Sequence, residues 1–188
     1  SDITLSTLSI AENSAGAIVG SISSTDIDST SATYTISGDD ATFFELTSDG
    51  SLKLKDNVSA DFEAKDSYSI TITATDPDGE TFSKSFTVSV TDVNDAPTAI
   101  ALSSLVFDEN VLGASIGTIN VTDSDATDDF TYTISGNDKD FFEVVNDTLK
   151  LIDTAAADFE AKSSFSITIT ATDSAGTSVS ENLTLLVN

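Results

Sequence analysis

The sequence predicts an all-β protein built from two tandem, seven-stranded Greek-key β-sandwiches. Three observations predict this fold: motifs such as that of Glu12 return 97 residues later, apolar residues alternate with polar ones, and turns containing Gly, Asp and Ser separate the alternating segments. Each half of the chain holds about seven such segments, as expected of a Greek-key sandwich of about 100 residues. We therefore predict repeats at 1–95 and 96–188, joined by a linker at about 92–97.

The internal repeat is the strongest sign of two similar domains. Its motifs and their copies, each displaced by 97 positions, are 12–13 with 109–110, 61–65 with 158–162, and 69–76 with 166–173. The segments 34–38 and 132–136 are displaced by 98 positions instead, which indicates a one-residue insertion in the loop after Asp125. Agreement along nearly the whole of both halves predicts that they share one fold.

Apolar residues recur with a period of two, which is the periodicity of β-strands. The clearest set alternates with Ser and Thr and consists of Tyr68, Ile70, Ile72 and Ala74. Further strands are predicted around Tyr34 and Ile36, Leu52 and Leu54, Phe82 to Val90, Leu5 to Ile10, and Ile18 to Ile22. Helix is predicted only as single turns near 59–65 and 155–162. Lys84 has the inward parity of its strand, and we expect its amine to reach solvent or to lie at an edge.

The composition excludes several classes of function. The chain has 32 acidic and 7 basic side chains, a formal net charge of −25, and no His or Cys. Nucleophilic Cys or Ser–His systems, the usual zinc sites and disulfides are therefore excluded. The negative charge disfavours nucleic acids and anionic membrane surfaces as partners, and no apolar run is long enough to insert into a membrane. With 39% hydrophobic residues the chain is predicted to fold, and cations are its natural partners.

The acidic residues point to a hard cation. Asp contributes 24 of the 32 acidic side chains, and many of these lie at the ends of the predicted strands. Calcium takes six to eight oxygen ligands from carboxylates, carbonyls and water, whereas magnesium, the main rival, usually retains several waters. A chain rich in oxygen ligands and empty of His and Cys fits calcium better than zinc or copper.

In their order along the chain, these motifs resemble the calcium-binding elements of cadherin repeats. The matching elements are Glu12-Asn13, Asp61-Phe62-Glu63, Asp92-Val93-Asn94-Asp95-Ala96-Pro97, Asp123-Ser124-Asp125 and Ala171-Thr172-Asp173. The high content of Asp, Thr and Ser without Cys or Arg resembles the cadherin-like repeats of large bacterial surface adhesins. The resemblance implies an immunoglobulin-like sandwich in each repeat and an extracellular location on a cell surface.

The resemblance also implies about three calcium ions at the junction between the repeats. The implied ligands are Glu12, Asp61, Glu63, Asp92, Asn94, Asp95, Asp123, Asp125 and Asp173, with the carbonyls of Val93 and Ala96 and one carbonyl near Asp128–Asp129. Half-sites are implied by Asp26, Asp28 and Asp76 for a preceding repeat, and by Glu109, Asp158 and Glu160 for a following one. We therefore expect this pair of repeats to be cut from a longer array.

Other interpretations of the same residues remain. Each Asp could simply form a turn or cap, although eight junction carboxylates nearly balance the six positive charges of three calcium ions. The segment 76–80 resembles the start of an EF-hand loop, but Thr87 stands where that loop needs a Glu, so a tight turn is favoured.

Asp61 and Glu63 could also be the two carboxylates of a glycosidase, but the chain has no Trp to stack against a sugar. The Thr-x-Thr runs at 71–73 and 168–170 are ordinary for strands and only weakly suggest an ice- or polysaccharide-binding face.

Two classes of function follow. The favoured one is a calcium-stiffened extender segment of a cell-surface adhesin, which holds another domain away from the cell. The alternative is a module whose repeats themselves bind a carbohydrate, a peptide or another copy of the chain, and an exposed apolar patch away from the junction would favour it. No catalytic residues are predicted, and we expect no enzymatic activity.

Overall fold

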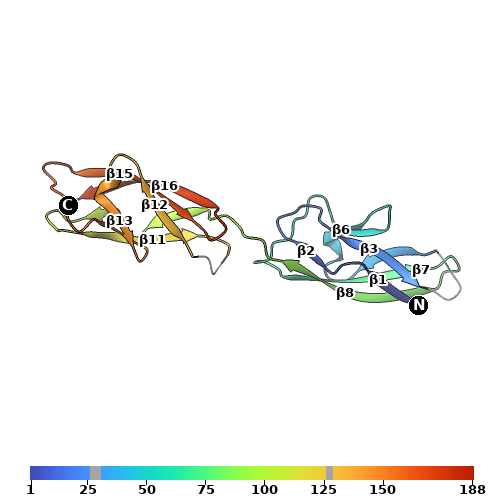
Figure 1. Cartoon of the computed structure of the whole chain (residues 1–188). Coiled ribbons are helices and arrows are strands. Elements are labelled where there is room, and N and C mark those ends of the chain that lie inside the picture. Colours follow the sequence, from blue (N-terminus) through green and yellow to red (C-terminus); the bar gives the residue numbers. More distant parts are fainter. Residues whose placement is uncertain (26–30, 126–128) are drawn as a thin grey trace. The chain divides into compact units, whose positions relative to one another are not determined.

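A computed structural model describes residues 1–25, 31–125 and 129–188. The chain divides into two compact units, Ser1–Val93 and Asn94–Asn188 (Figure 1), each of which is described by itself. This division lies two residues before the boundary between Asp95 and Ala96 that the sequence predicts. Within the described ranges the units contain strands, turns and two short 3-10 helices, so the predicted all-β class is confirmed.

The first unit is a sandwich of two four-stranded sheets. One sheet has the order β1-β3-β6-β5, with β1 at Asp2–Leu5, β3 at Ile18–Thr25, β5 at Phe44–Leu46 and β6 at Ser51–Leu54. The other has the order β2-β8-β7-β4, with β2 at Ser9–Ala11, β4 at Thr33–Ser37, β7 at Ser67–Thr75 and β8 at Thr81–Thr91. All pairs are antiparallel except β2 with β8, which is parallel.

The second unit repeats this topology. Its sheets have the orders β13-β14-β11-β9 and β10-β16-β15-β12, with β10 parallel to β16. The strands are β9 at Ala99–Leu102, β10 at Val106–Phe107, β11 at Ser115–Thr122, β12 at Thr131–Ser135, β13 at Phe142–Val145, β14 at Thr148–Leu151, β15 at Ser164–Thr172 and β16 at Ser178–Val187. The common topology explains why the motifs keep their spacing in the two halves.

The period of two places one face of each central strand in the core. Tyr68, Ile70 and Ile72 on β7 are buried, and their neighbours on the strand are exposed or half-buried. Phe165, Ile167 and Ile169 on β15 do the same in the second unit. Each unit has its own buried apolar cluster, so each sandwich buries a complete core.

Two predicted strands differ from the structure in a way that the backbone explains. The predicted strand Leu5–Ile10 is split, because β1 pairs with β3 in one sheet and β2 pairs with β8 in the other, giving eight strands in the described part of each unit. In β3 a β-bulge between Ile18 and Gly20 shifts the alternation, so Ile18 is exposed and Val19 is buried.

The predicted helical turns lie elsewhere in the chain. The 3-10 helices are η1 at Ala41–Phe43 and η2 at Lys139–Phe141, just before β5 and β13. The segments 59–65 and 155–162 contain hydrogen-bonded turns instead of helix. Lys84 agrees with its prediction: its half-buried side chain extends to the edge strand β1, where Nζ donates to Asp2 Oδ1 at 2.7 Å and to the Ile3 carbonyl at 2.8 Å.

A nearly buried carboxylate precedes each 3-10 helix. The side chain of Asp40 is 9% exposed, and its two oxygens accept from Lys65 Nζ and from the backbone amide of Ser69, each at 2.7 Å. In the second unit Asp138 accepts from Lys162 Nζ and, at 2.8 Å, from the amide of Ser166. Burial raises the pKa of Asp40, but the ammonium and the amide outweigh it and hold that pKa below its ordinary value.

The pKa of Asp138 is also lowered, and the ammonium of Lys162 is the largest cause.

In residues 1–25, 31–125 and 129–188, no helix has the length and apolar character needed to cross a membrane.

We expect Gly117→Ala to lower the free energy of unfolding of the second unit by about 1–3 kcal/mol. Gly117 lies at a bulge of β11, and a Cβ there would lie 2.8 Å from the Ser104 amide nitrogen and 3.1 Å from the Ser104 carbonyl oxygen. Urea unfolding followed by circular dichroism measures the change, and Ser115→Ala on the exposed face of the same strand is the control. Equal stability of the two variants would contradict the close approach.

We expect the stabilising effect of Asp138 to disappear in acid. Because its pKa is lowered in the folded state, its contribution is fully present above the ordinary value of 3.8 and is lost as the pH falls through the folded-state pKa. Melting curves in chelator, from about pH 6 down to about pH 2.5, should show wild type and Asp138→Asn converging. Asp140→Asn, an exposed neighbour, should differ little from wild type throughout, and a pH-independent gap for Asp138→Asn would refute the assignment.

Candidate metal centre

The first unit gathers three of the predicted ligands at one end of its sandwich. Carboxylate oxygens of Glu12, Asp61 and Glu63 lie within 4.8 Å of one another, and we call this set the Glu12 cluster. Glu12 directly follows β2, whose parallel pairing with β8 brings Ala11 beside Thr91. The other two residues belong to a turn shortly before β7. The fold therefore brings together residues that lie about 50 positions apart.

Glu12 anchors the cluster through backbone hydrogen bonds. The residue is only 3% exposed, and its Oε2 accepts from the amide of Phe62 at 2.7 Å while its Oε1 accepts from the amide of Val93 at 2.8 Å. A buried carboxylate is tolerated when amides satisfy its oxygens. The Glu12 carboxylate thus joins the turn that contains Asp61 to the segment that follows β8.

The turn that carries the other two ligands is closed by Asp61. Its Oδ1 accepts from the amide of Ala64 at 2.9 Å, and its backbone carbonyl accepts from the amide of Lys65 at 2.9 Å. Asp61 and Glu63 are exposed, so cations in solution can reach them. A carboxylate oxygen has more than one lone pair, so these hydrogen bonds leave capacity for a metal ion.

The Asn that follows Glu12, and its counterpart after Glu109 in the second unit, have a backbone role that the motifs alone do not predict. Asn13 has φ 58° and Asn110 has φ 60°, in the left-handed region that Asn tolerates better than most residues. The amide of Asn13 donates to the Ala60 carbonyl at 3.0 Å, and that of Asn110 donates to the Ala157 carbonyl at 2.8 Å. The Glu-Asn pairs in the sequence are the signal for this sharp turn.

The second unit carries a copy of the cluster. Carboxylate oxygens of Glu109, Asp158 and Glu160 also lie within 4.8 Å of one another. Glu109 Oε2 accepts from the amide of Phe159 at 2.8 Å, as Glu12 does from Phe62. The structure thus brings together the three residues that the sequence predicts as a half-site, with the same internal geometry.

The opposite end of the second unit holds the predicted ligands Asn94, Asp95, Asp123, Asp125 and Asp173. Asp125 Oδ2 accepts from the amide of Asp95 at 2.7 Å, and Asp123 Oδ1 accepts from the amide of Asp125 at 3.3 Å. Asn94 Nδ2 donates to Asp173 Oδ2 at 3.1 Å. Among the described residues of this end, backbone and side-chain amide groups link the carboxylates.

One oxygen at this end lacks a partner. Asp123 Oδ2 is buried, and it is the only buried side-chain polar atom in the described ranges without a hydrogen-bond partner. A buried carboxylate oxygen without a donor is costly, because the charge loses its water and gains nothing in exchange. A bound cation would satisfy it, so the residues present fit a metal ion at this position.

Asp173 is held in its charged form. The residue is 5% exposed, and it accepts from the hydroxyl of Thr177 and, at 2.8 Å, from the Thr177 amide. The Thr177 hydroxyl contributes most to a lowered pKa of about 2, which burial opposes and the Asn94 amide reinforces. At neutral pH Asp173 therefore offers a fully ionised carboxylate to a cation.

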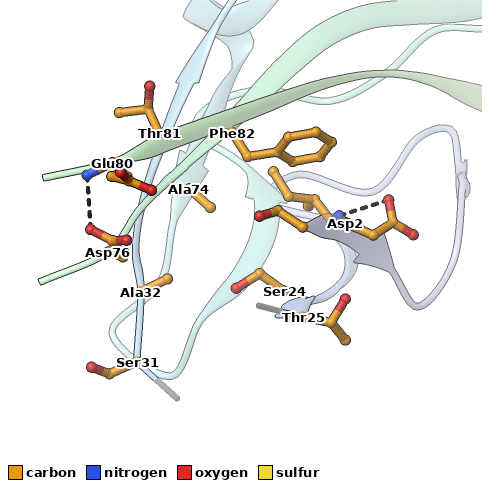
Figure 2. Close-up of a pocket in the computed structure, with 12 residues that line it drawn as sticks. Asp2, Ser24, Thr25, Ser31, Ala32, Ala74, Asp76, Glu80, Thr81 and Phe82 are labelled. Atoms are coloured by element: carbon orange, nitrogen blue, oxygen red, sulfur yellow. Dashed lines mark hydrogen bonds between the residues drawn. The ribbon is translucent and has the colours of Figure 1, made fainter. Parts of the chain in front are cut away.

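The corresponding end of the first unit is described only in part. Asp26 and Asp28 lie outside the described residues, as does Asp128 in the second unit. Asp76 accepts from the amide of Glu80 at 2.8 Å in the tight turn between β7 and β8 (Figure 2), so the segment 76–80 forms the turn that the sequence favours.

Beside this turn lies a cavity of about 70 Å³, whose lining includes Asp76, Glu80, Ala32, Ala74 and Phe82 (Figure 2). Ala32 leaves room there because it is small. Its counterpart in the second repeat is Phe130, which packs against the core of that unit.

The remaining predicted ligands lie in the connecting segment 92–98, which has no strand or helix. Asp92, Val93 and Ala96 are exposed there, so their oxygens are accessible. Val93 and Ala96 are predicted to bind through carbonyl oxygens. The whole predicted donor set is carboxylate, amide and carbonyl oxygen, which suits a hard cation.

Another exposed feature of the second unit is apolar. Leu105, Val106 and Leu186 are 39–48% exposed, and the parallel pairing of β10 with β16 sets Val106 beside Leu186. The first repeat has Ser9 and Ser89 at the positions of Val106 and Leu186. Of the three residues, only Leu105 has an exposed apolar counterpart in the first unit, Leu8, so the pair Val106 and Leu186 is particular to the second unit.

Comparison with known proteins agrees with this architecture. The family model of the cadherin domain matches residues 6–91 and 103–188. PcdhgB3 EC1-4 is 27% identical with a TM-score of 0.76, over 99% of this chain and 49% of that chain. Protocadherin gamma B2 extracellular cadherin domains 3-6 are 25% identical with a TM-score of 0.73, over 100% of this chain and 47% of that chain.

Human protocadherin-24 EC1-2 is 20% identical with a TM-score of 0.77, over 100% of this chain and 96% of that chain, a likeness that concerns the fold. The chain spans about half the length of the two gamma protocadherin structures. The two cadherin-domain matches fall one in each unit, and together they cover most of the sequence. The chain therefore belongs to the cadherin family, with one cadherin domain in each of its two units.

Proposed function

We propose that the two repeats bind calcium at their junction, where the ions stiffen the connection, and that the pair acts as an extender segment of an extracellular adhesin. The observation that carries the proposal is the buried Asp123 Oδ2, which lacks a hydrogen-bond donor at the end of the second unit where the predicted ligands gather. The absence of Cys and Arg and the wealth of Asp, Ser and Thr support a large bacterial surface protein as the source.

The short connecting segment supports a shared site. The amide of Val93 is bonded to Glu12 in the first unit, and in the second unit the side chain of Asn94 is bonded to Asp173. Val93 and Asn94 are consecutive, and consecutive Cα atoms are about 3.8 Å apart. The hydrogen bonds of Glu12 and of Asp173 therefore go to consecutive residues of the chain, which supports a calcium cluster with ligands from both repeats.

The proposed role follows from charge. Without a cation the carboxylates at this segment repel one another, and the connection from Asp92 to Pro97 acts as a hinge. Calcium supplies the positive charge that offsets this repulsion and accepts oxygens from both repeats, so the angle between them becomes fixed. Extracellular calcium modules usually have dissociation constants of about 10⁻⁴–10⁻³ M. Sites of that affinity at the joint would bind calcium outside a cell.

We expect millimolar calcium to raise the melting temperature of the chain. Binding to the folded state alone contributes about 2.7 kcal/mol per independent site at one hundred times its dissociation constant. Differential scanning calorimetry in calcium and in chelator measures the shift, and isothermal titration gives the number of ions. Magnesium at the same concentration is the control. A melting temperature that calcium does not change would refute calcium binding at this junction.

We expect Asp125→Asn to weaken calcium binding by about tenfold or more, because it removes one charge from the ligand set, while leaving both cores intact. The amide oxygen of Asn can still accept from Asp95, so the local hydrogen bond is kept and only the charge is lost. Isothermal titration measures affinity, and the melting temperature in chelator should stay close to that of wild type. Asp140→Asn removes an equal charge from η2 and should bind calcium as wild type does; equal weakening by both variants would indicate a general charge effect.

A second candidate function is that the repeats themselves bind a carbohydrate, a peptide or another copy, and the apolar patch of Leu105, Val106 and Leu186 favours it. Replacing Val106 and Leu186 by Ser, as in the first repeat, should then abolish self-association in sedimentation experiments or a saturable signal on glycan and peptide arrays. The same signals should survive Asp125→Asn. A monomer without array binding would rule this candidate out.

A further inference from the structure

We propose that the ion pair between Asp40 and Lys65 is a positioning device for the metal-ligand turn, an inference that rests on the proposed calcium function. Neither residue is a predicted ligand. Lys65 ends the turn that begins at Asp61, and Asp40 lies 25 residues before Lys65, ahead of η1. The pair therefore joins the ligand turn to a distant part of the sandwich.

The turn needs an anchor outside the metal cluster. At its first residues the anchor is Glu12, which accepts from the amide of Phe62. Glu12 is itself a predicted ligand, so repulsion from the neighbouring carboxylates also acts on Glu12. At the other end, Lys65 carries the opposite charge and reaches away to Asp40 at 2.7 Å. This second contact holds the turn without using any ligand oxygen.

Asp40 is well placed to act as a fixed point. Its carboxylate bridges Lys65 Nζ to the amide of Ser69, at the start of β7, with both contacts at 2.7 Å. Its own amide donates to the Ser69 carbonyl at 3.4 Å. Phe43 and Phe44 contact the ring of Tyr68 at 5.5 and 5.4 Å between centroids, so the segment that follows Asp40 is packed onto β7.

Lys65 is aligned as well as paired. Its Nζ lies 5.3 Å from the centre of the Tyr68 ring, within the range of a cation–π contact. The Lys65 ammonium thus contacts both the aromatic ring and the nearly buried carboxylate of Asp40. With its side chain 43% exposed, Lys65 can remain hydrated if Asp40 is neutralised, which makes replacement of Asp40 the cleaner test.

The second repeat has the same device. Asp138 accepts from Lys162 and from Ser166, and Lys162 Nζ lies 4.8 Å from the centre of the Phe165 ring. Lys162 ends the turn from Asp158, in the copy of the Glu12 cluster. The residues directly after the two Asp differ, Ala41-Thr42 in one repeat and Lys139-Asp140 in the other. The carboxylate, the lysine and the aromatic ring recur although their surroundings change.

If the pair stabilised only the fold, removing it would lower the melting temperature and change nothing else. A positioning pair should also change the ligand turn itself, with or without calcium. We expect Asp40→Asn, which keeps an oxygen for the Ser69 amide, to weaken calcium binding by about tenfold, as outer-shell substitutions typically do. The double variant with Lys65→Gln should bind no more weakly than Asp40→Asn, because both changes remove one interaction.

The matched control is Asp56→Asn, which also removes one charge from a Lys–Asp pair of the first unit. Asp56 pairs with Lys53 through a side chain that is 85% exposed, and neither residue belongs to the ligand turn. Isothermal titration of CaCl₂ well below the melting temperature should give the control the wild-type affinity. Asp40→Glu, which restores a carboxylate, should recover part of the loss.

A second measurement needs no calcium. In chelator, amide hydrogen exchange at Ala64 and Lys65 should be about tenfold faster in Asp40→Asn than in wild type or in the control, while exchange in the centre of β7 stays unchanged. Wild-type exchange at these two amides in Asp40→Asn would overturn the positioning role, and so would wild-type calcium affinity in that variant. If wild type binds no calcium, the proposed function fails, and the exchange rates alone decide whether the pair holds the turn.

Discussion

Repulsion among carboxylates held at the ends of the sandwiches is the constraint on which the other features depend. Burying two apolar cores forces the strand ends, and the acidic residues that follow them, into small regions. Backbone amides offset part of the repulsion, as at Glu12 and Asp173. They cannot neutralise a formal net charge of −25, and Asp123 keeps a buried oxygen without a donor. On the proposed function, cations that bind such a chain would raise its stability and fix the joint between its repeats.

The sandwich fold was predictable because it depends on patterns that a sequence displays directly. The period of two at Tyr68, Ile70 and Ile72 specifies which face of β7 is buried, and the 97-residue displacement shows that the fold occurs twice. The split of the first strand was not predictable, since it depends on which sheet each short half can pair with. The bulge at Gly20 was missed for a similar reason: the close contact with Ser6 that excludes a Cβ is tertiary.

The candidate site was predictable in its residues and less so in its supports. Glu12, Asp61 and Glu63 were named from motif order, and the fold brings them together. Their supports are hydrogen bonds between segments distant in sequence, such as Asp40 with Lys65, which no local pattern reveals. The left-handed Asn13 was visible as part of a motif, but its backbone role required the dihedral angles. Metal binding by these residues remains a prediction, because carboxylates can gather without an ion.

The most direct test of the account is the distribution of distances between the two repeats. The chain has no Cys, so Thr87→Cys and Thr184→Cys, at exposed and equivalent positions of β8 and β16, would place spin labels at two defined sites. Double electron–electron resonance in chelator should give a broad distribution, and millimolar calcium should reduce it to one narrow peak. A distribution of equal width in chelator and in calcium would contradict the claim that calcium fixes the joint.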